Sequence, residues 1–118
     1  MIKRKGEEMS SLKQLQKELS DVGDFLVALG DEKRQAIIIA LLADQPCQGK
    51  RVSELTTATA LSRPAVSHHL KILKQAGLVA YRREGTRNYY YLSHDTSSIN
   101  QLKQVLDDVT SVIQEAAK

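Results

Sequence analysis

Few residues of this chain are of types that do chemistry, and two of them, His68 and His69, are adjacent in the stretch SRPAVSHHLKILKQAGLV over residues 62–79. Imidazole rings serve as metal ligands, as general acids and bases, and as donors or acceptors of hydrogen bonds. On a helix, successive side chains diverge by about 100°, so the two rings point in different directions and cannot act as one pair. Each histidine therefore needs its own interpretation.

The helix expected over residues 63–76 has one apolar face and one polar face. Val66, Leu70 and Leu73 fall within about 60° of one another and define the face turned toward the core. His69 lies on the flank of that face, and no Cys, Asp or Glu lies three or four residues away from it. This predicts a partly buried histidine that hydrogen-bonds a neighbouring element, rather than a metal ligand. The opposite face carries Pro64, Ser67, His68, Lys71 and Gln75.

The outward face suits insertion into the major groove of DNA. Short side chains near its start allow the backbone to approach base edges, and the longer basic side chains further on reach phosphates. A hairpin expected over residues 78–93 adds arginines around a glycine turn, which fits a minor groove or its phosphates. A solvated helix beside a charged hairpin is the alternative, but their adjacency favours DNA. The residues predicted to contact DNA are Ser62, Arg63, Pro64, Ser67, His68, Lys71, Lys74, Arg82, Arg83 and Arg87.

The basic side chains are unevenly distributed along the chain. The 118 residues carry a net charge of +3, but residues 62–93 alone hold six Lys and Arg against the single acid Glu84. A basic segment inside a nearly neutral chain indicates contact with a polyanion or a solvated charged face.

Composition narrows the class of protein. Hydrophobic residues make up 42% and charged residues 26% of the chain, as in ordinary globular domains. No apolar run approaches about 18 residues, and the N-terminus lacks the apolar stretch of a signal peptide, so we expect a cytoplasmic protein without membrane contact. The single Cys47 excludes an internal disulfide framework. The sequence has no Gly-rich phosphate loop and no nucleophile with a plausible base, so we expect no enzyme, no cofactor and no catalytic residues.

Apolar stripes at helical spacing mark both ends of the chain. Residues 10–29 carry apolar side chains spaced 3, 4, 3, 4 and 3, and residues 97–116 repeat the spacing 3, 4, 3 and 4. Two such stripes exceed what one small core needs, so we expect a two-fold symmetric dimer through these terminal helices. The predicted dimer interface consists of Leu12, Leu15, Leu19, Val22, Ile99, Leu102, Leu106, Val109 and Ile113.

Local signals between the two stripes predict the remaining elements. Asp31 predicts the N-cap of a helix, EKRQAIIIALLA, which is apolar on most of its circumference and is therefore expected to be buried centrally. Ser53 predicts the cap of a short helix, and Ser62 that of the next one, which ends at Gly77. The β-rich run LVAYRREGTRNYYYLS is broken at residues 84–86, which is typical of a hairpin.

The predicted fold class is mainly α with a small β-hairpin (α+β), arranged as a winged helix-turn-helix with flanking dimerisation helices. We expect one domain over residues 1–118, with a disordered arm over residues 1–9. The helix-turn-helix is expected over residues 53–77 and the wing over residues 78–93.

The stretch LSRPAVSHHLKILKQAGLVAYRREGTRNYYYLS resembles the recognition helix and wing of the ArsR-type (ArsR/SmtB) winged-helix repressors. ALGDEKRQAIIIALL is similar to that family's second helix, which often reads Leu-Ala-Asp-Pro-Thr-Arg; Asp31 and Arg34 match, whereas Glu32 and Lys33 depart from it. The most specific part is Ser67, His69 and Leu70, followed by Ala76-Gly77-Leu78-Val79. The resemblance spans roughly residues 20–115. It implies a homodimer that binds operator DNA and represses transcription, usually until an inducer releases it.

The family's metal-sensing patterns are not kept. Where many relatives have Cys-Val-Cys-Asp, this chain reads RVSEL, so Arg51 and Ser53 replace the thiols and only Glu54 keeps the carboxylate. The last helix, which holds histidine ligands in another group of relatives, has no histidine after His94. The adjacent Asp107 and Asp108 are expected to line a solvated face, and without imidazole or thiol the acids of this helix are expected to form no metal site. These acids are Asp95, Asp107, Asp108 and Glu115.

Together these features predict a dimeric, sequence-specific repressor that binds double-stranded DNA at an imperfect inverted repeat, with half-site centres about 10–12 bp apart. Its unknown inducer is expected not to be a thiol- or His-ligated metal. Two alternatives stay open. One is a winged-helix protein-interaction module, in which Tyr89, Tyr90 and Tyr91 contact a partner. The other is a redox-responsive repressor acting through Cys47.

Overall fold

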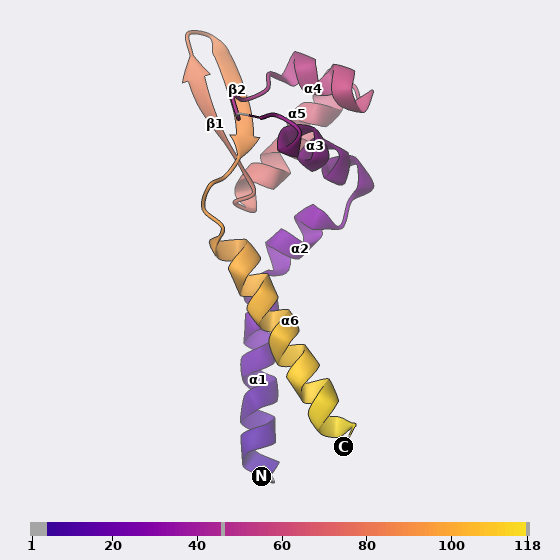
Figure 1. The fold of residues 1–118 in the computed structure, drawn as a ribbon, viewed down its shortest axis with the longest axis vertical. Coiled ribbons are helices and arrows are strands. Elements are labelled where there is room, and N and C mark those ends of the chain that lie inside the picture. Colours follow the sequence, from indigo (N-terminus) through magenta and orange to yellow (C-terminus); the bar gives the residue numbers. More distant parts are fainter. Residues whose placement is uncertain (1–4, 46, 118) are drawn as a thin grey trace. The chain divides into compact units, whose positions relative to one another are not determined.

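The computed structural model describes residues 5–45 and 47–117, with side chains from residue 11 onward. It is mainly helical with one antiparallel hairpin, which confirms the predicted fold class (Figure 1). The chain divides into two compact units, one formed by Met1–Gly23 with Thr96–Lys118 and the other by Asp24–Asp95. The elements are α1 (Lys5–Asp21), α2 (Gly23–Leu29), α3 (Glu32–Leu42), α4 (Val52–Thr59), α5 (Arg63–Gln75), β1 (Val79–Glu84), β2 (Arg87–Leu92) and α6 (Ser97–Ala116).

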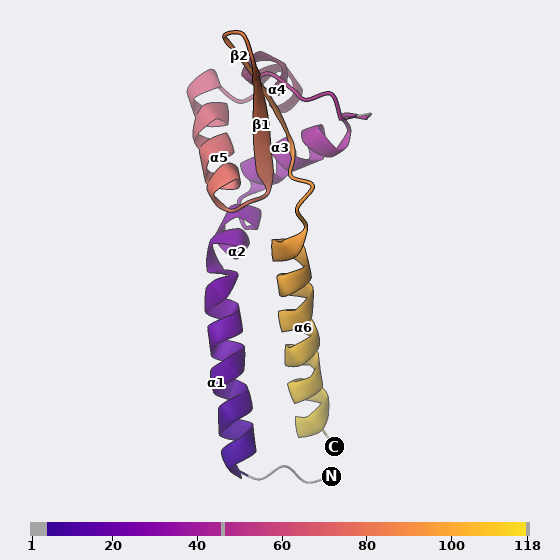
Figure 2. The same cartoon turned by 90° about the vertical axis from the view of Figure 1, so that its left-hand side faces the viewer.

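The first unit is a pair of helices. Figure 2 shows α1 and α6 running side by side in opposite directions, and the two helices contact each other. Val22 and Val105 are each only 2% exposed and form its buried apolar core. α6 has the bounds predicted for the C-terminal helix.

The single helix predicted over residues 10–29 is wrong, because the chain turns at Val22 and forms α1 and α2. Gly23 follows the turn, and glycine is a poor helix former that permits such a break. α1 also begins at Lys5, so residues 5–9, predicted to be disordered, are helical. No proline stands in this stretch to prevent a helix. The rest of the predicted arm lies outside the described residues.

A row of apolar side chains on this unit faces away from its core. Leu106 is 55% and Ile113 is 62% exposed, and Ile99 is exposed as well. These three residues of α6 are spaced by seven, which places them along one line of the helix. On α1, Leu12 and Leu19 are exposed with the same spacing, whereas Val22 is buried within the chain and so leaves the predicted dimer interface.

The acids of α6 do not share one environment. Asp107 is exposed, as predicted, but Asp108 is half-buried and faces α1. A hydrogen bond with Asp108, burial, and the negative charges of Asp108 and Asp21 raise the pKa of Glu18 on α1. Ionised carboxylates only accept hydrogen bonds, so this contact between two carboxyls is satisfied when one of them holds a proton.

The second unit has its own core, built between α3, α4, α5 and the hairpin, which contact one another. The central burial predicted for α3 holds for one side of the helix only, since Ile39 is 65% and Leu42 is 54% exposed. Its neighbours cover only one side of this helix, which buries Ile37 and Leu41. The apolar core of this unit consists of Phe25, Ala28, Ile37, Leu41, Leu55, Val66, Leu70, Leu73, Leu78 and Val79.

Local signals explain most of the boundaries in this unit. The Asp31 carboxylate accepts hydrogen bonds from the backbone N–H groups of residues 33 and 34, at 2.9 and 3.0 Å, which confirms the predicted N-cap of α3. Ser62 caps α5 by accepting from Ala65 N at 3.2 Å. Ser53, however, is not the cap of α4. α4 begins at Val52, one residue before Ser53, so Arg51 is its N-cap. Glu54 Oε1 accepts from the backbone N–H of Arg51 at 3.1 Å.

The hairpin pairs β1 with β2 in antiparallel register, from Val79 opposite Leu92 to Glu84 opposite Arg87. Gly85 adopts φ +63° in the turn, a conformation that glycine accommodates without strain. Lys50, in the segment between α3 and α4, bridges to Tyr90 through two backbone hydrogen bonds of 2.8 Å. This bridge ties the base of the hairpin to the segment before α4. Over the described residues, no helix is long and apolar enough to cross a membrane.

Candidate nucleic-acid interface

The two faces of α5 lie as the sequence predicts. Val66, Leu70 and Leu73 are at most 1% exposed, which anchors the helix on the core of the second unit. The side chains predicted to meet the major groove are on the opposite, exposed side: Ser62, Arg63, Pro64, Ser67, His68, Lys71 and Lys74. Pro64 lies in the first turn, where its missing N–H costs no intrahelical hydrogen bond. The helix therefore presents a polar, basic surface and keeps its apolar surface inside.

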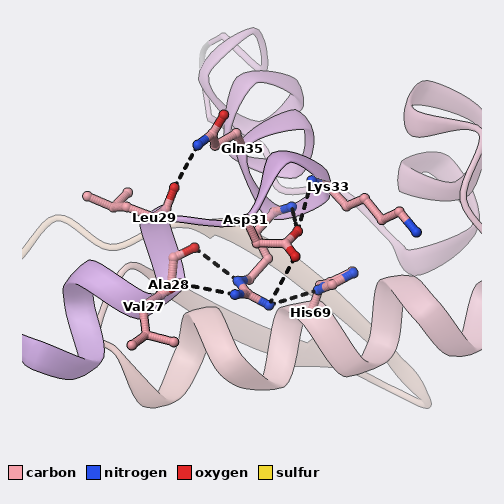
Figure 3. Close-up of polar contacts among 8 residues, drawn as sticks. Val27, Ala28, Leu29, Asp31, Lys33, Gln35 and His69 are labelled. Carbon is pink, nitrogen blue, oxygen red and sulfur yellow. Dashed lines mark hydrogen bonds and ion pairs between the residues drawn. The ribbon is translucent and has the colours of Figure 1, made fainter.

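His69 is buried and contacts α3, as expected for a histidine that bonds a neighbouring element. Its Nδ1 lies 3.3 Å from NH1 of Arg34, and Figure 3 shows the ring turned toward the segment around Asp31. Arginine only donates hydrogen bonds, so Nδ1 must accept, and the ring is the neutral tautomer with its proton on Nε2. α5 is thereby tied to α3 through a side-chain contact.

Arg34 joins three elements. Besides the contact with His69 on α5, its Nε donates to Ala28 O and its NH2 to Val27 O, each at 3.0 Å (Figure 3). These carbonyls end α2, and the last carbonyls of a helix have no partner within it. The Asp31 carboxylate lies 4.0 Å from the same guanidinium. Arg34 therefore supplies hydrogen-bond donors to the last carbonyls of α2 and, through His69, also holds α5 in place.

Burial lowers the pKa of His69 below its usual value, and the charges of Arg34, His68 and Lys33 lower it further, against the opposing charge of Asp31. The neutral ring is thus favoured in the folded protein. Since the folded pKa lies below the unfolded value, the unfolded chain binds more protons between the two. The stability from this group is complete above about pH 6.5 and is lost as the pH falls from there through the folded pKa.

We expect the unfolding free energy to decrease between pH 7.5 and pH 5.5, and His69→Asn to reduce that decrease. An amide oxygen can still accept from Arg34 but does not titrate. Denaturant unfolding at the two pH values measures the effect, with His68→Asn, on the exposed face, as the matched control. If His69→Asn keeps the full pH dependence of the unaltered protein, the titrating group lies elsewhere.

The arginines of the hairpin have different partners. Arg82 donates from Nε to Glu84 Oε1 at 2.9 Å, bonds Gln48 O through NH2, and lies over the ring of Tyr89 at 5.0 Å. Its guanidinium is thus engaged within the chain. Arg83 donates to Gly85 O at 3.1 Å, next to the turn, and both Arg83 and Arg87 are exposed. These two are the hairpin arginines best placed to reach a ligand.

The tyrosines of β2 pack within the hairpin. Tyr90 pairs with Tyr81 across the strands with ring centroids 5.6 Å apart, and Lys74 of α5 lies 4.9 Å from the centroid of Tyr81. The residues from Tyr89 to Tyr91 are half-buried. Tyr81 of β1 therefore joins α5 to the wing, and Tyr90 packs against it.

Arg51, which precedes α4, was missed as a basic residue of this surface. It lines one depression together with Arg63 of α5 and Arg87 of β2. From the sequence, Arg51 is interpreted only as the replacement of a thiol ligand. The signal that was available is its place immediately before a helix of the predicted helix-turn-helix, where basic residues meet phosphates.

The thiol and imidazole groups form no large cluster. Cys47 Sγ lies 3.9 Å from His94 Nε2, and the His94 ring lies 5.8 Å from that of Tyr91. In the part of the chain that the structure describes, no group of three or more His, Cys, Asp or Glu residues could hold a metal ion.

The comparisons with known proteins agree on one family. Residues 32–81 match the model of the family described as "Bacterial regulatory protein, arsR family". The chain is 38% identical over 100 residues to the "Transcriptional repressor SmtB homolog" of Synechocystis sp., covering 85% of this chain and 69% of that protein. It is also 38% identical over 88 residues to an uncharacterized HTH-type transcriptional regulator of Methanocaldococcus jannaschii, covering 73% and 91%.

A solved structure agrees with these sequence matches. Reduced HlyU from Vibrio cholerae N16961 superposes with a TM-score of 0.62 at 29% identity, covering 75% of this chain and 90% of that one. The resemblance in sequence, the matched residues over α3, α4, α5 and the start of β1, and the shared winged helix-turn-helix therefore lead to one conclusion. The chain belongs to the ArsR family of bacterial regulatory proteins.

Proposed function

We propose that this protein is a dimeric, sequence-specific DNA-binding repressor of transcription, released by an inducer other than a thiol- or His-ligated metal. The exposed polar face of α5, held against the core by Val66, Leu70 and Leu73, carries the proposal. That face stands next to the basic hairpin in the same compact unit. The family and the name of the Synechocystis relative support the same function.

The proposed DNA contacts divide between two elements. Ser67 and His68 on α5 are placed to meet base edges, and Arg63, Lys71 and Lys74 to meet phosphates. Arg83 and Arg87 of the hairpin add charge. Arg82 is left out of this set because its guanidinium already bonds Gln48 O and Glu84.

The most direct test is a footprint of the purified protein on the promoter region of its own gene. We expect protection of an imperfect inverted repeat, with half-site centres about 10–12 bp apart for a two-fold symmetric dimer. The absence of any protected repeat, together with salt-independent binding, would instead support a winged-helix protein-interaction module.

Substitutions on α5 and on the hairpin should have different effects. Ser67→Ala or His68→Ala removes a group near base edges, so the operator should lose about 1–3 kcal/mol of binding free energy while random DNA loses little. Arg83→Ala or Arg87→Ala should weaken operator and random DNA together and lower the slope of log K against log salt by about one unit per lost phosphate contact. Titrations on both DNAs at several salt concentrations measure this. Equal loss on both DNAs for the α5 variants would contradict the assignment.

A further inference from the structure

Three arginines from three parts of the chain line one surface depression. Arg51 precedes α4, Arg63 begins α5 and Arg87 begins β2, and the depression that they share has a volume of about 340 Å³. None of its lining residues is acidic, so three positive charges gather around one space. Like charges repel, and an anion placed between them relieves that repulsion. The remaining lining residues are Val52, Ser53, Thr86 and Asn88.

The nearby carboxylates are engaged with other bases. Glu54 lies 3.7 Å from Lys50 Nζ and also accepts from the backbone of Arg51, while Glu84 is paired with Arg82. Among the side chains that the structure describes, no carboxylate lies within 4.0 Å of a guanidinium nitrogen of the three lining arginines. Their charge is therefore not neutralised within the described part of the chain.

The side chains that line the depression suit a phosphate. A guanidinium presents parallel N–H donors that match two phosphate oxygens, and three residues that carry such a group line this space. The starts of two helices, α4 at Val52 and α5 at Arg63, also lie there, and the N-terminal end of a helix carries partial positive charge. Ser53, Thr86 and Asn88 add side chains that can donate hydrogen bonds.

We propose that the depression lined by Arg51, Arg63 and Arg87 binds one phosphate group, which in the DNA complex is a phosphodiester of the operator backbone. This rests on the proposed function. A single phosphate held between the helix-turn-helix and the wing fixes the register of α5 on the duplex without reading a base. A free phosphate-bearing ligand has the same chemistry and would fill the depression in the absence of DNA.

The first test is Arg51→Gln, which removes the charge and keeps a polar side chain. Operator and random DNA should each bind about tenfold more weakly at 0.1 M salt, and the salt slope should fall by about one unit per protomer. Lys17→Ala is the matched control, because this exposed lysine of α1 belongs to the other compact unit. It should change neither quantity.

The second test locates the phosphate. Each operator phosphate is replaced in turn by an uncharged methylphosphonate, and binding is measured for the unaltered protein and for Arg51→Gln. One position per half-site should weaken the unaltered protein about tenfold and Arg51→Gln clearly less, since the variant has already lost part of the same contact.

A third measurement separates the two sources of phosphate. Inorganic phosphate is compared with sodium chloride at equal ionic strength, and the midpoint of thermal unfolding is followed without DNA. A phosphate-specific rise in the unaltered protein but not in Arg51→Gln, with no coupled methylphosphonate position, would assign the site to a free phosphate ligand and overturn the backbone assignment.

The proposal as a whole is overturned if Arg51→Gln binds DNA as Lys17→Ala does and inorganic phosphate shifts neither unfolding midpoint. Failure of the proposed function looks different. In that case the unaltered protein gives no footprint on its promoter, and the unfolding measurements alone decide whether the depression binds phosphate.

Discussion

Leu106→Glu is expected to convert the protein from a dimer to a monomer while leaving the fold of each chain intact. Leu106 is 55% exposed in the single chain, so a carboxylate there costs little in the monomer. In the proposed dimer, the seam formed by Ile99, Leu106 and Ile113 is covered by the partner, and two unpaired carboxylates are buried. We expect a loss of at least about 3 kcal/mol, which raises the dimer dissociation constant more than about 100-fold.

Sedimentation at micromolar concentration tests this expectation. The unaltered protein should sediment as a dimer, and the variant as a monomer with an unchanged far-ultraviolet circular dichroism spectrum. Gln101→Glu, which adds the same charge at an exposed position of α6 about 140° around the helix from Leu106, is the control and should remain dimeric. A monomeric unaltered protein, or a variant that dimerises normally, would show that these apolar residues of α6 face solvent in the functional state.

Local signals predicted the elements of the second unit well. Asp31 and Ser62 cap their helices, and Gly85 lies in the turn of the hairpin. These features are predictable because a helix cap or a tight turn depends on only a few neighbouring residues. The break at Val22 was missed because an apolar stripe that stays in register on either side of a turn looks the same as one on a continuous helix. The exposure of Ile39 was missed because periodicity identifies apolar positions but not which neighbours cover them.

The candidate site was predictable where one helix determines it and unpredictable where distant segments meet. The inward and outward faces of α5 follow from helical geometry alone. The partner of His69 does not, since Arg34 lies 35 residues away in the sequence. The same holds for the meeting of Arg51 with Arg87, which depends on how the hairpin folds back beside α4. Such contacts follow from tertiary packing and leave no signal in a single sequence.

Arg34→Ala is expected to lower the free energy of unfolding of the second unit by about 2–4 kcal/mol. Arg34 is 9% exposed, and its guanidinium donates to Ala28 O and Val27 O at 3.0 Å. Its removal leaves these two helix-terminal carbonyls without their charged donor and His69 Nδ1 without its partner. Each lost bond to a charged group costs about 1.5–3 kcal/mol, and water entering the site recovers part of that sum.

Denaturant unfolding at pH 7.5 measures this loss, with Lys33→Ala as the matched control. Lys33 is the neighbouring cation on α3, but its side chain is exposed, so its removal should cost less than about 0.5 kcal/mol. Arg34→Lys should resemble Arg34→Ala more than the unaltered protein, because one ammonium cannot reach both carbonyls and the imidazole together. Arg34→Ala should also weaken the pH dependence attributed to His69, since the adjacent positive charge that disfavours its protonation is gone. An Arg34→Ala protein as stable as Lys33→Ala, with an unchanged pH profile, would show that the junction of α2, α3 and α5 is held by apolar packing alone.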